Sequence, residues 1–231
     1  MKTVANVIFV NLVLILGLAN RVQSASLLTN ASFETPTVPV AGEANFNTGS
    51  TGITGWTVVG PQVSIVSGST TQLGFTLSAE DGTQWLDLTG NGTNSDLDGV
   101  TQSLPTAVGT TYTLSYFVGN IVNPGGPLGT SSTVNVYVNG TLIQVAANTG
   151  AGAAINWEQF QTPFIASSSL TAITFRNGDP ATDNLNGLDN VVVNAATPEP
   201  SSLPVFTVLA VVVAGVFAHG RLKSQGGSSE S

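Results

Sequence analysis

The chain has 231 residues, a formal net charge of −8 at pH 7 and no cysteine. Eleven of its thirteen acidic residues lie between residues 26 and 196, together with a single basic residue, Arg176. So much negative charge repels nucleic acid, which excludes a nucleic-acid partner, and without cysteine no disulfide can stabilise the fold. The roughly 170 residues of this middle part suffice for one domain with its own core.

Residues 1–25 have the order of a secretory signal peptide. Lys2 provides a positive charge, residues 7–19 form an apolar run, and small residues around Ala25 offer a cleavage site. A first membrane anchor is the alternative. We therefore expect an exported protein whose mature domain occupies residues 26–196.

Short β-type runs separated by turn residues fill this domain. They predict strands at residues 55–59, 63–66, 83–88, 99–104, 111–118, 133–138, 141–146, 157–164, 171–176 and 188–194. Ten short strands without an amphipathic helix are typical of an all-β sandwich.

Turn residues separate these runs in a way that also predicts local geometry. Valines alternate with other residues through 133–138, and Asn139-Gly140 follows at once before the β pattern resumes. Asn-Gly between two such runs predicts a β-hairpin with a type I′ turn. Residues 177–180, with the sequence NGDP, are predicted as a further turn, and the Gly- and Pro-rich residues 123–129 as a loop.

The C-terminal end contains a long uncharged run. No residue between Glu199 and Arg221 carries a formal charge, and as a helix this run would span about 30 Å, the thickness of the hydrocarbon core of a bilayer. We predict a transmembrane helix at residues 203–220 that places the protein in the membrane. Arg221 and Lys223 would lie on the cytoplasmic side, followed by a polar tail at residues 224–231.

Three parts of the C-terminal end, and the order in which they follow one another, resemble the PEP-CTERM sorting signal of Gram-negative bacteria. They are the triplet Pro198-Glu199-Pro200, the apolar span, and the basic pair Arg221 and Lys223. The resemblance covers residues 197–223 and implies an exosortase, a membrane protease, as partner. It also implies anchoring in the inner membrane during sorting and a final place at the cell surface or in the extracellular matrix. The basic patch is thinner than is usual in that family.

A eukaryotic GPI-anchored surface protein is an alternative, with glycosylation sequons at Asn30, Asn91 and Asn139. A GPI tail is normally apolar to its end, whereas this chain ends in polar residues.

Within the middle domain, a series of motifs resembles the galactose-binding-like jelly rolls, which include carbohydrate-binding modules. The opening LLTNASFE at residues 27–34 is followed by motifs at residues 55–56, 85–88, 100–104, 109–117 and 188–191. The resemblance implies a jelly-roll β-sandwich. It also implies a structural calcium ion that ties the first strand to the last, with Glu34 and Asp189 as ligands. Hard oxygen ligands are what Ca²⁺ requires. Asp96 and Asp98 form an alternative calcium loop, with Asn91 and Asn94 close in the sequence.

Carbohydrate binding needs an exposed aromatic side chain. The three tryptophans fall within strand patterns and are expected in the core. Tyr137 shares a strand face with Asn135 and Asn139, opposite the valines, so we predict Tyr137 as the ligand-binding aromatic.

The sequence gives little support to an enzyme. The only histidine, His219, lies at the end of the apolar span, and there is no cysteine. We therefore assign no catalytic residue and predict a non-catalytic envelope protein that associates with matrix polysaccharide. A glycan-active hydrolase that uses a pair of carboxylates is the alternative.

Overall fold

The computed structural model describes residues 26–92 and 94–196. The predicted signal peptide, and the predicted sorting signal with its transmembrane helix and polar tail, lie outside the described residues and stay predictions. In the part of the chain that the structure describes, no helix is long and apolar enough to cross a membrane.

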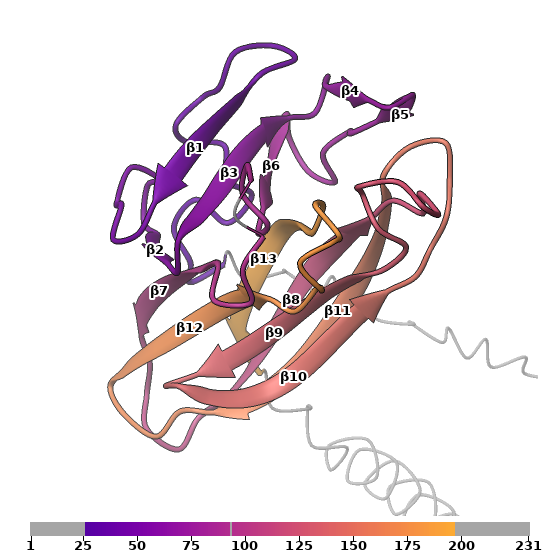
Figure 1. The fold of residues 1–231 in the computed structure, drawn as a ribbon. Coiled ribbons are helices and arrows are strands. Elements are labelled where there is room, and N and C mark those ends of the chain that lie inside the picture. The colour runs from indigo at the N-terminus through magenta and orange to yellow at the C-terminus, as the bar shows by residue number, and fades with distance from the viewer. Residues whose placement is uncertain (1–25, 93, 197–231) are drawn as a thin grey trace, which may run out of the picture.

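The described chain forms two large antiparallel sheets stacked face to face (Figure 1). The six-stranded sheet contains, in spatial order, β1 (Glu43–Asn47), β3 (Gln62–Ser67), β6 (Gln84–Asp87), β13 (Gly187–Ala195), β8 (Thr111–Asn120) and β11 (Asn156–Ile165). The five-stranded sheet contains β10 (Thr141–Asn148), β9 (Ser132–Val138), β12 (Leu170–Asn177), β7 (Gly99–Pro105) and β2 (Thr57–Val59). A small separate hairpin joins β4 (Thr71–Gln72) and β5 (Phe75–Thr76).

Consecutive strands pass repeatedly from one sheet to the other, as between β7 and β8, β8 and β9, and β10 and β11. This wrapping is that of a jelly roll, so the predicted all-β jelly-roll sandwich is confirmed. All ten predicted strands are present, with bounds that shift by a few residues at most. The structure adds β1, β4 and β5, which were not predicted.

The first and last segments of the domain lie together. The N–H of Leu27 donates to the carbonyl of Val193 at 3.0 Å, and the N–H of Val191 donates to that of Ala31 at 2.9 Å. The N-terminal segment is therefore attached to β13, which confirms the closure that a jelly roll requires.

The main core fills the space between the two sheets, and a chain of aromatic rings runs through it. Trp56 packs between Phe33 and Phe175, with ring centroids 5.3 and 6.2 Å away, and Tyr116 meets Phe175 edge-on at 5.1 Å. The side chain of Trp56 is only 1% exposed, and its indole N–H donates to the carbonyl of Asn30 at 3.0 Å. The prediction that Trp56 belongs to the core is confirmed.

A second apolar cluster lies on the other face of the six-stranded sheet. Successive side chains of a strand point to opposite faces of the sheet. The side chain of Leu86 therefore belongs to the main core, whereas that of its neighbour Trp85 points to the other face and belongs to the second cluster. Trp157, on β11, is half-buried and meets Trp85 edge-on at 5.8 Å. Its indole N–H donates to the carbonyl of Ser78 at 2.9 Å, so this cluster holds the β5–β6 loop (residues 77–83) against the sheet.

The β9–β10 hairpin has the predicted turn. Asn139 and Gly140 both have positive φ, 48° and 79°, as a type I′ turn requires. Val138 and Thr141 pair on either side of the turn. The side chain of Asn139 also accepts a hydrogen bond from the N–H of Ala172 at 2.8 Å, which ties the turn to the start of β12.

Candidate functional site

Glu34 lies in the irregular segment before β1 and is half-buried. Its Oε1 accepts hydrogen bonds from the N–H groups of Thr83 at 2.9 Å and Gln84 at 3.0 Å, and its Oε2 accepts one from the Thr83 hydroxyl at 2.7 Å. Gly82 has a φ of +72°, and a Cβ at this position would come within 2.4 Å of Oε1. Glycine is therefore required there both for the backbone conformation and for the close approach of Glu34.

Asp189 lies on β13 and is fully buried. Its Oδ2 accepts hydrogen bonds from the N–H groups of Glu80 at 2.9 Å and Asp81 at 3.1 Å, and its Oδ1 accepts one from the N–H of Asn190 at 2.8 Å. Burial raises the pKa of Asp189 to about 8, although these hydrogen bonds oppose the rise. Repulsion from Glu80 adds a smaller increase.

The structure thus brings both predicted calcium ligands to one feature, the β5–β6 loop. Two more carboxylates belong to this loop: Glu80 accepts a hydrogen bond from the Asn190 amide at 2.7 Å, and Asp81 accepts one from the Ser32 hydroxyl at 2.8 Å. Carboxylate oxygens of this kind fit the ligand chemistry of calcium. No three acidic, histidine or cysteine side chains of the described residues are placed so as to hold a metal ion by themselves. A calcium ion here would need backbone carbonyls in addition to Glu34 and Asp189.

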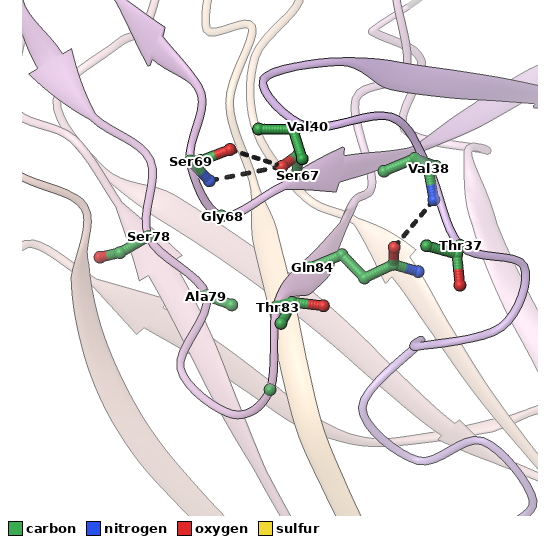
Figure 2. Close-up of a pocket in the computed structure, with 11 residues that line it drawn as sticks. Thr37, Val38, Val40, Ser67, Gly68, Ser69, Ser78, Ala79, Thr83 and Gln84 are labelled. Atoms are coloured by element: carbon green, nitrogen blue, oxygen red, sulfur yellow. Dashed lines mark hydrogen bonds between the residues drawn. The ribbon is translucent and has the colours of Figure 1, made fainter.

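A pocket of about 510 Å³ opens beside the same loop (Figure 2). Three segments form its walls: the residues before β1, the end of β3, and the β5–β6 loop with the first residue of β6. The lining residues are Thr37, Val38, Val40, Ser67, Gly68, Ser69, Ser78, Ala79, Gly82, Thr83 and Gln84. None of them carries an ionisable side chain, and six carry a hydroxyl or amide group. The pocket therefore carries no charged side chain, and its polar groups lie among a mostly apolar lining.

Several of these polar groups hold the walls in place. The hydroxyls of Ser67 and Ser69 lie 2.9 Å apart, and both accept a hydrogen bond from the N–H of Ala41. The side-chain oxygen of Gln84 accepts one from the N–H of Val38 at 3.0 Å (Figure 2). These contacts join the three walls to one another, so the pocket is formed before any ligand binds.

Thr37 and Ser78 differ from the other polar residues of the pocket. Their hydroxyls take part in none of the hydrogen bonds among the described residues, and they lie on opposite sides of the pocket in Figure 2. Two free hydroxyls in a neutral pocket can exchange hydrogen bonds with a ligand that itself carries hydroxyl groups. The lining has no histidine, cysteine or carboxylate that could activate a serine as a nucleophile.

Tyr137 lies on the outer face of the five-stranded sheet, as predicted. Val134 and Val136 are buried, whereas Tyr137 is half-buried and pairs with Leu142 of β10 and Thr174 of β12. Tyr137 does not line the pocket, which lies where β3 ends and β6 begins in the other sheet. Its role in ligand binding stays a prediction.

The alternative calcium loop shows a different arrangement. Asp96 is exposed, whereas Asp98 is buried and accepts hydrogen bonds from the N–H groups of Gln62 and Ser95, both at 2.8 Å. Asn94 donates from its side chain to the carbonyl of Asp183 at 2.7 Å. These contacts fix the loop before β7 to its neighbours.

Asp87 is a buried carboxyl that the sequence analysis did not single out as a site residue. Asp87, at the end of β6, accepts three hydrogen bonds at Oδ1: from the N–H of Thr89 at 3.0 Å, from the Thr89 hydroxyl at 2.8 Å and from the N–H of Asn186 at 3.1 Å. Burial raises the pKa of Asp87 to about 7, and repulsion from Glu43 adds to this. The strand pattern gave no signal, because burial on the outer face of a sheet depends on the loops that cover it.

Comparison with solved structures shows the same fold elsewhere. Two structures of a cyclase from Fischerella sp. TAU each match 76% of this chain. The match covers 99% of the cyclase chain in the complex with 4-(1H-indol-3-yl)butan-2-one and 98% of the cyclase chain in the other structure. The TM-score is 0.53 for both, with 15% and 17% sequence identity respectively. The CBM22-1 xylan-binding domain of Paenibacillus barcinonensis Xyn10C matches 69% of this chain and 96% of its own, with a TM-score of 0.41 and 18% identity. The likeness to the cyclase shows a shared fold. No curated protein matches this chain.

The family profile described as "Protein of unknown function (DUF642)" matches residues 26–194. The match extends from the N-terminal segment that carries Glu34 almost to the end of β13. It therefore includes both calcium-ligand candidates and every wall of the pocket. The chain belongs to the DUF642 family.

Proposed function

We propose that this protein is exported, held at the bacterial cell envelope by its C-terminal signal, and binds a neutral polysaccharide through its jelly-roll domain without catalysis. The neutral pocket beside the β5–β6 loop is the observation that carries the proposal. Its free hydroxyls, on Thr37 and Ser78, suit the hydroxyl groups of a sugar. The domain has eleven acidic residues and one basic residue, so an anionic polysaccharide would be repelled.

Binding to a panel of neutral and anionic polysaccharides tests this function. Thr37→Ala and Ser78→Ala should each weaken binding of a neutral glycan by about two- to tenfold, the worth of one hydrogen bond, with an unchanged melting temperature. Thr141→Ala is the matched control, since Thr141 is exposed at the start of β10, away from the pocket. Full affinity in both pocket variants, or a preference for anionic glycans, would contradict the proposal.

The proposed location has its own test. Anchoring is proposed because of the uncharged run between Glu199 and Arg221 and the PEP-CTERM-like order of motifs around it. A chain truncated after Ala196 should be released from membranes, while the full chain fractionates with them and depends on an exosortase-type protease for processing. A truncated chain that still behaves as an integral membrane protein would contradict the anchoring.

We also propose a structural calcium ion at Glu34 and Asp189. An ion there would attach the N-terminal segment and β13 to the β5–β6 loop, and would thereby stabilise one wall of the pocket. The support is that Glu34 and Asp189 both contact the β5–β6 loop, in a domain whose sequence contains only one basic residue.

A second candidate function is a glycan-active hydrolase, and Asp87 is the observation that favours it. Burial raises the pKa of Asp87 to about 7, with a small addition from Glu43, and a carboxyl with such a pKa is suited to donate and accept protons at neutral pH. Turnover of a polysaccharide that is lost in Asp87→Asn would favour the hydrolase. Binding without turnover would favour the non-catalytic module.

A further inference from the structure

A set of buried polar side chains lies where β12 ends and the following segment leads back to β13. This buried polar cluster consists of Asp87, Asn177, Asp179 and Asn186, and the backbone of Thr133 bonds to it. Asn177 and Asn186 are fully buried, Asp179 is 4% exposed and Asp87 8% exposed. The cluster is separate from the neutral pocket and shares no residue with its lining.

Two members of the cluster are held by the same pair of residues. Asp179 accepts a hydrogen bond at Oδ1 from the N–H of Thr133 at 2.6 Å, and its own N–H donates to Oδ1 of Asn177 at 3.1 Å. The side-chain amide of Asn186 donates to the carbonyl of Thr133 at 2.6 Å and to Oδ1 of Asn177 at 2.8 Å. Asp179 and Asn186 are therefore both held by Thr133 and Asn177.

Each of these two side chains leaves one oxygen atom without a partner. Oδ2 of Asp179 and Oδ1 of Asn186 are both buried, and neither forms a hydrogen bond. The orientation of the Asn186 amide is set by its nitrogen, which donates to two oxygen atoms. Oδ1 of Asn186 is an acceptor, and so is Oδ2 of Asp179 whenever its carboxyl is ionised, although burial raises the pKa of that carboxyl to about 8. A buried acceptor without a partner costs free energy. Both atoms then require either a donor or a cation.

The charges around the cluster favour a cation. Repulsion from Asp183 and Asp87 acts on Asp179, so several carboxylates lie near one another. The single basic residue between 26 and 196 is Arg176, and its guanidinium donates to the carbonyl of Leu97 at 3.4 Å. That guanidinium forms none of the hydrogen bonds of the cluster, so no described basic side chain bonds to it.

We propose that the buried polar cluster binds one hard divalent cation, of the calcium class, through Oδ2 of Asp179 and Oδ1 of Asn186. Carboxylate and amide oxygens are the ligands such an ion prefers. Asp183, whose repulsion acts on Asp179, is the nearby carboxylate that also lines a cavity of about 310 Å³ with the glycine-rich loop at residues 123–130. This site depends neither on the polysaccharide nor on the calcium ion at Glu34 and Asp189.

Calcium titration of the full-length, chelator-treated protein tests the site by calorimetry. The background is the double variant Glu34→Gln/Asp189→Asn, which removes the other candidate ligands. This variant should still bind one calcium ion per chain. Adding Asp179→Asn should weaken that binding by about tenfold or more, since changes even to the outer partners of metal ligands have effects of this size. Glu158→Gln, which removes the same charge from an exposed side chain on β11, is the control and should leave the affinity unchanged.

Two results would overturn the proposal: a double variant that binds no calcium, or an Asp179→Asn variant that binds as well as its parent. If Asp179→Asn does not fold, crystals of the double variant grown with Mn²⁺ give a direct measurement. An anomalous peak between Asp179 and Asn186 would support the site. A peak only elsewhere, or no peak, would overturn it.

Discussion

Glu34 and Asp189, which come from opposite ends of the domain sequence, both accept hydrogen bonds from backbone N–H groups at the β5–β6 loop. Glu34 receives them at the end of the loop, from Thr83 and Gln84, and Asp189 receives them from its middle. The same loop forms one wall of the neutral pocket. A change at either carboxylate should therefore alter the pocket as well as the stability of the domain.

Calcium should stabilise the protein through these two carboxylates. An ion that binds only the native state stabilises it by about 2.7 kcal/mol at a concentration of 100 times its Kd, which corresponds to a melting temperature about 5–10 °C higher. Thermal unfolding in calcium and in excess chelator measures this difference. Glu34→Gln and Asp189→Asn should each lose part of the response to calcium, and the double variant most of it.

The size of the calcium response is the quantity to compare, because both carboxylates hold the loop without any ion. Each substitution should also lower the melting temperature in chelator, because the amide has one accepting oxygen and one donor where the carboxylate has two accepting oxygens. An equal calcium response in the parent and the double variant would contradict a site at Glu34 and Asp189.

Gly82→Ala should destabilise the domain more than Gly74→Ala. Both glycines have positive φ, +72° and +87°, so both substitutions carry the same backbone penalty of about 1 kcal/mol. A Cβ at position 82 would in addition come within 2.4 Å of Oε1 of Glu34, whereas a Cβ at position 74 meets nothing within 4 Å. Urea unfolding of the two variants measures the difference in unfolding free energy. Equal losses of stability in the two variants would contradict the prediction, because they would mean that the Glu34 side chain can move away from the added Cβ without destabilising the domain.

Much of the fold could be predicted from the sequence, because strand periodicity reports directly which residues face the core. Strand β1 was missed since it is an edge strand in which Ala44 and Phe46 are the only apolar residues. The pocket could not be predicted, because its walls are three segments that become neighbours only in the fold. Asp179 was read only as a turn residue, since nothing local shows that it is buried.

Trp56→Ala should cost about 3–5 kcal/mol of unfolding free energy, as expected for a large aromatic side chain removed from a packed core. Trp56 lies between Phe33 and Phe175 and also donates a hydrogen bond to the N-terminal segment. Trp56→Phe should cost less, because it keeps an aromatic ring in the gap. Chemical unfolding measures both values. If Trp56→Ala unfolds like the parent but loses glycan binding, Trp56 is a binding residue and its assignment to the core is wrong.

The buried carboxyl of Asp87 should make stability fall as the pH rises toward 8. Its pKa is about 7 in the folded protein against an ordinary value of 3.8, so between these values the native state binds more protons than the unfolded state. Stability from this group is therefore fully present below about pH 4 and is lost as the pH rises through 7.

The unfolding free energy that one such group contributes changes by at most about 1.4 kcal/mol per pH unit. Asp87→Asn cannot ionise, so its stability relative to the parent should increase steadily as the pH rises from 5 to 7 and then level off toward pH 8. Urea unfolding in chelator between pH 5 and 8 measures the gap, with the exposed Asp96→Asn as the control that should follow the parent throughout. A gap between Asp87→Asn and the parent that does not change with pH would mean that the Asp87 carboxyl stays ionised in the folded protein.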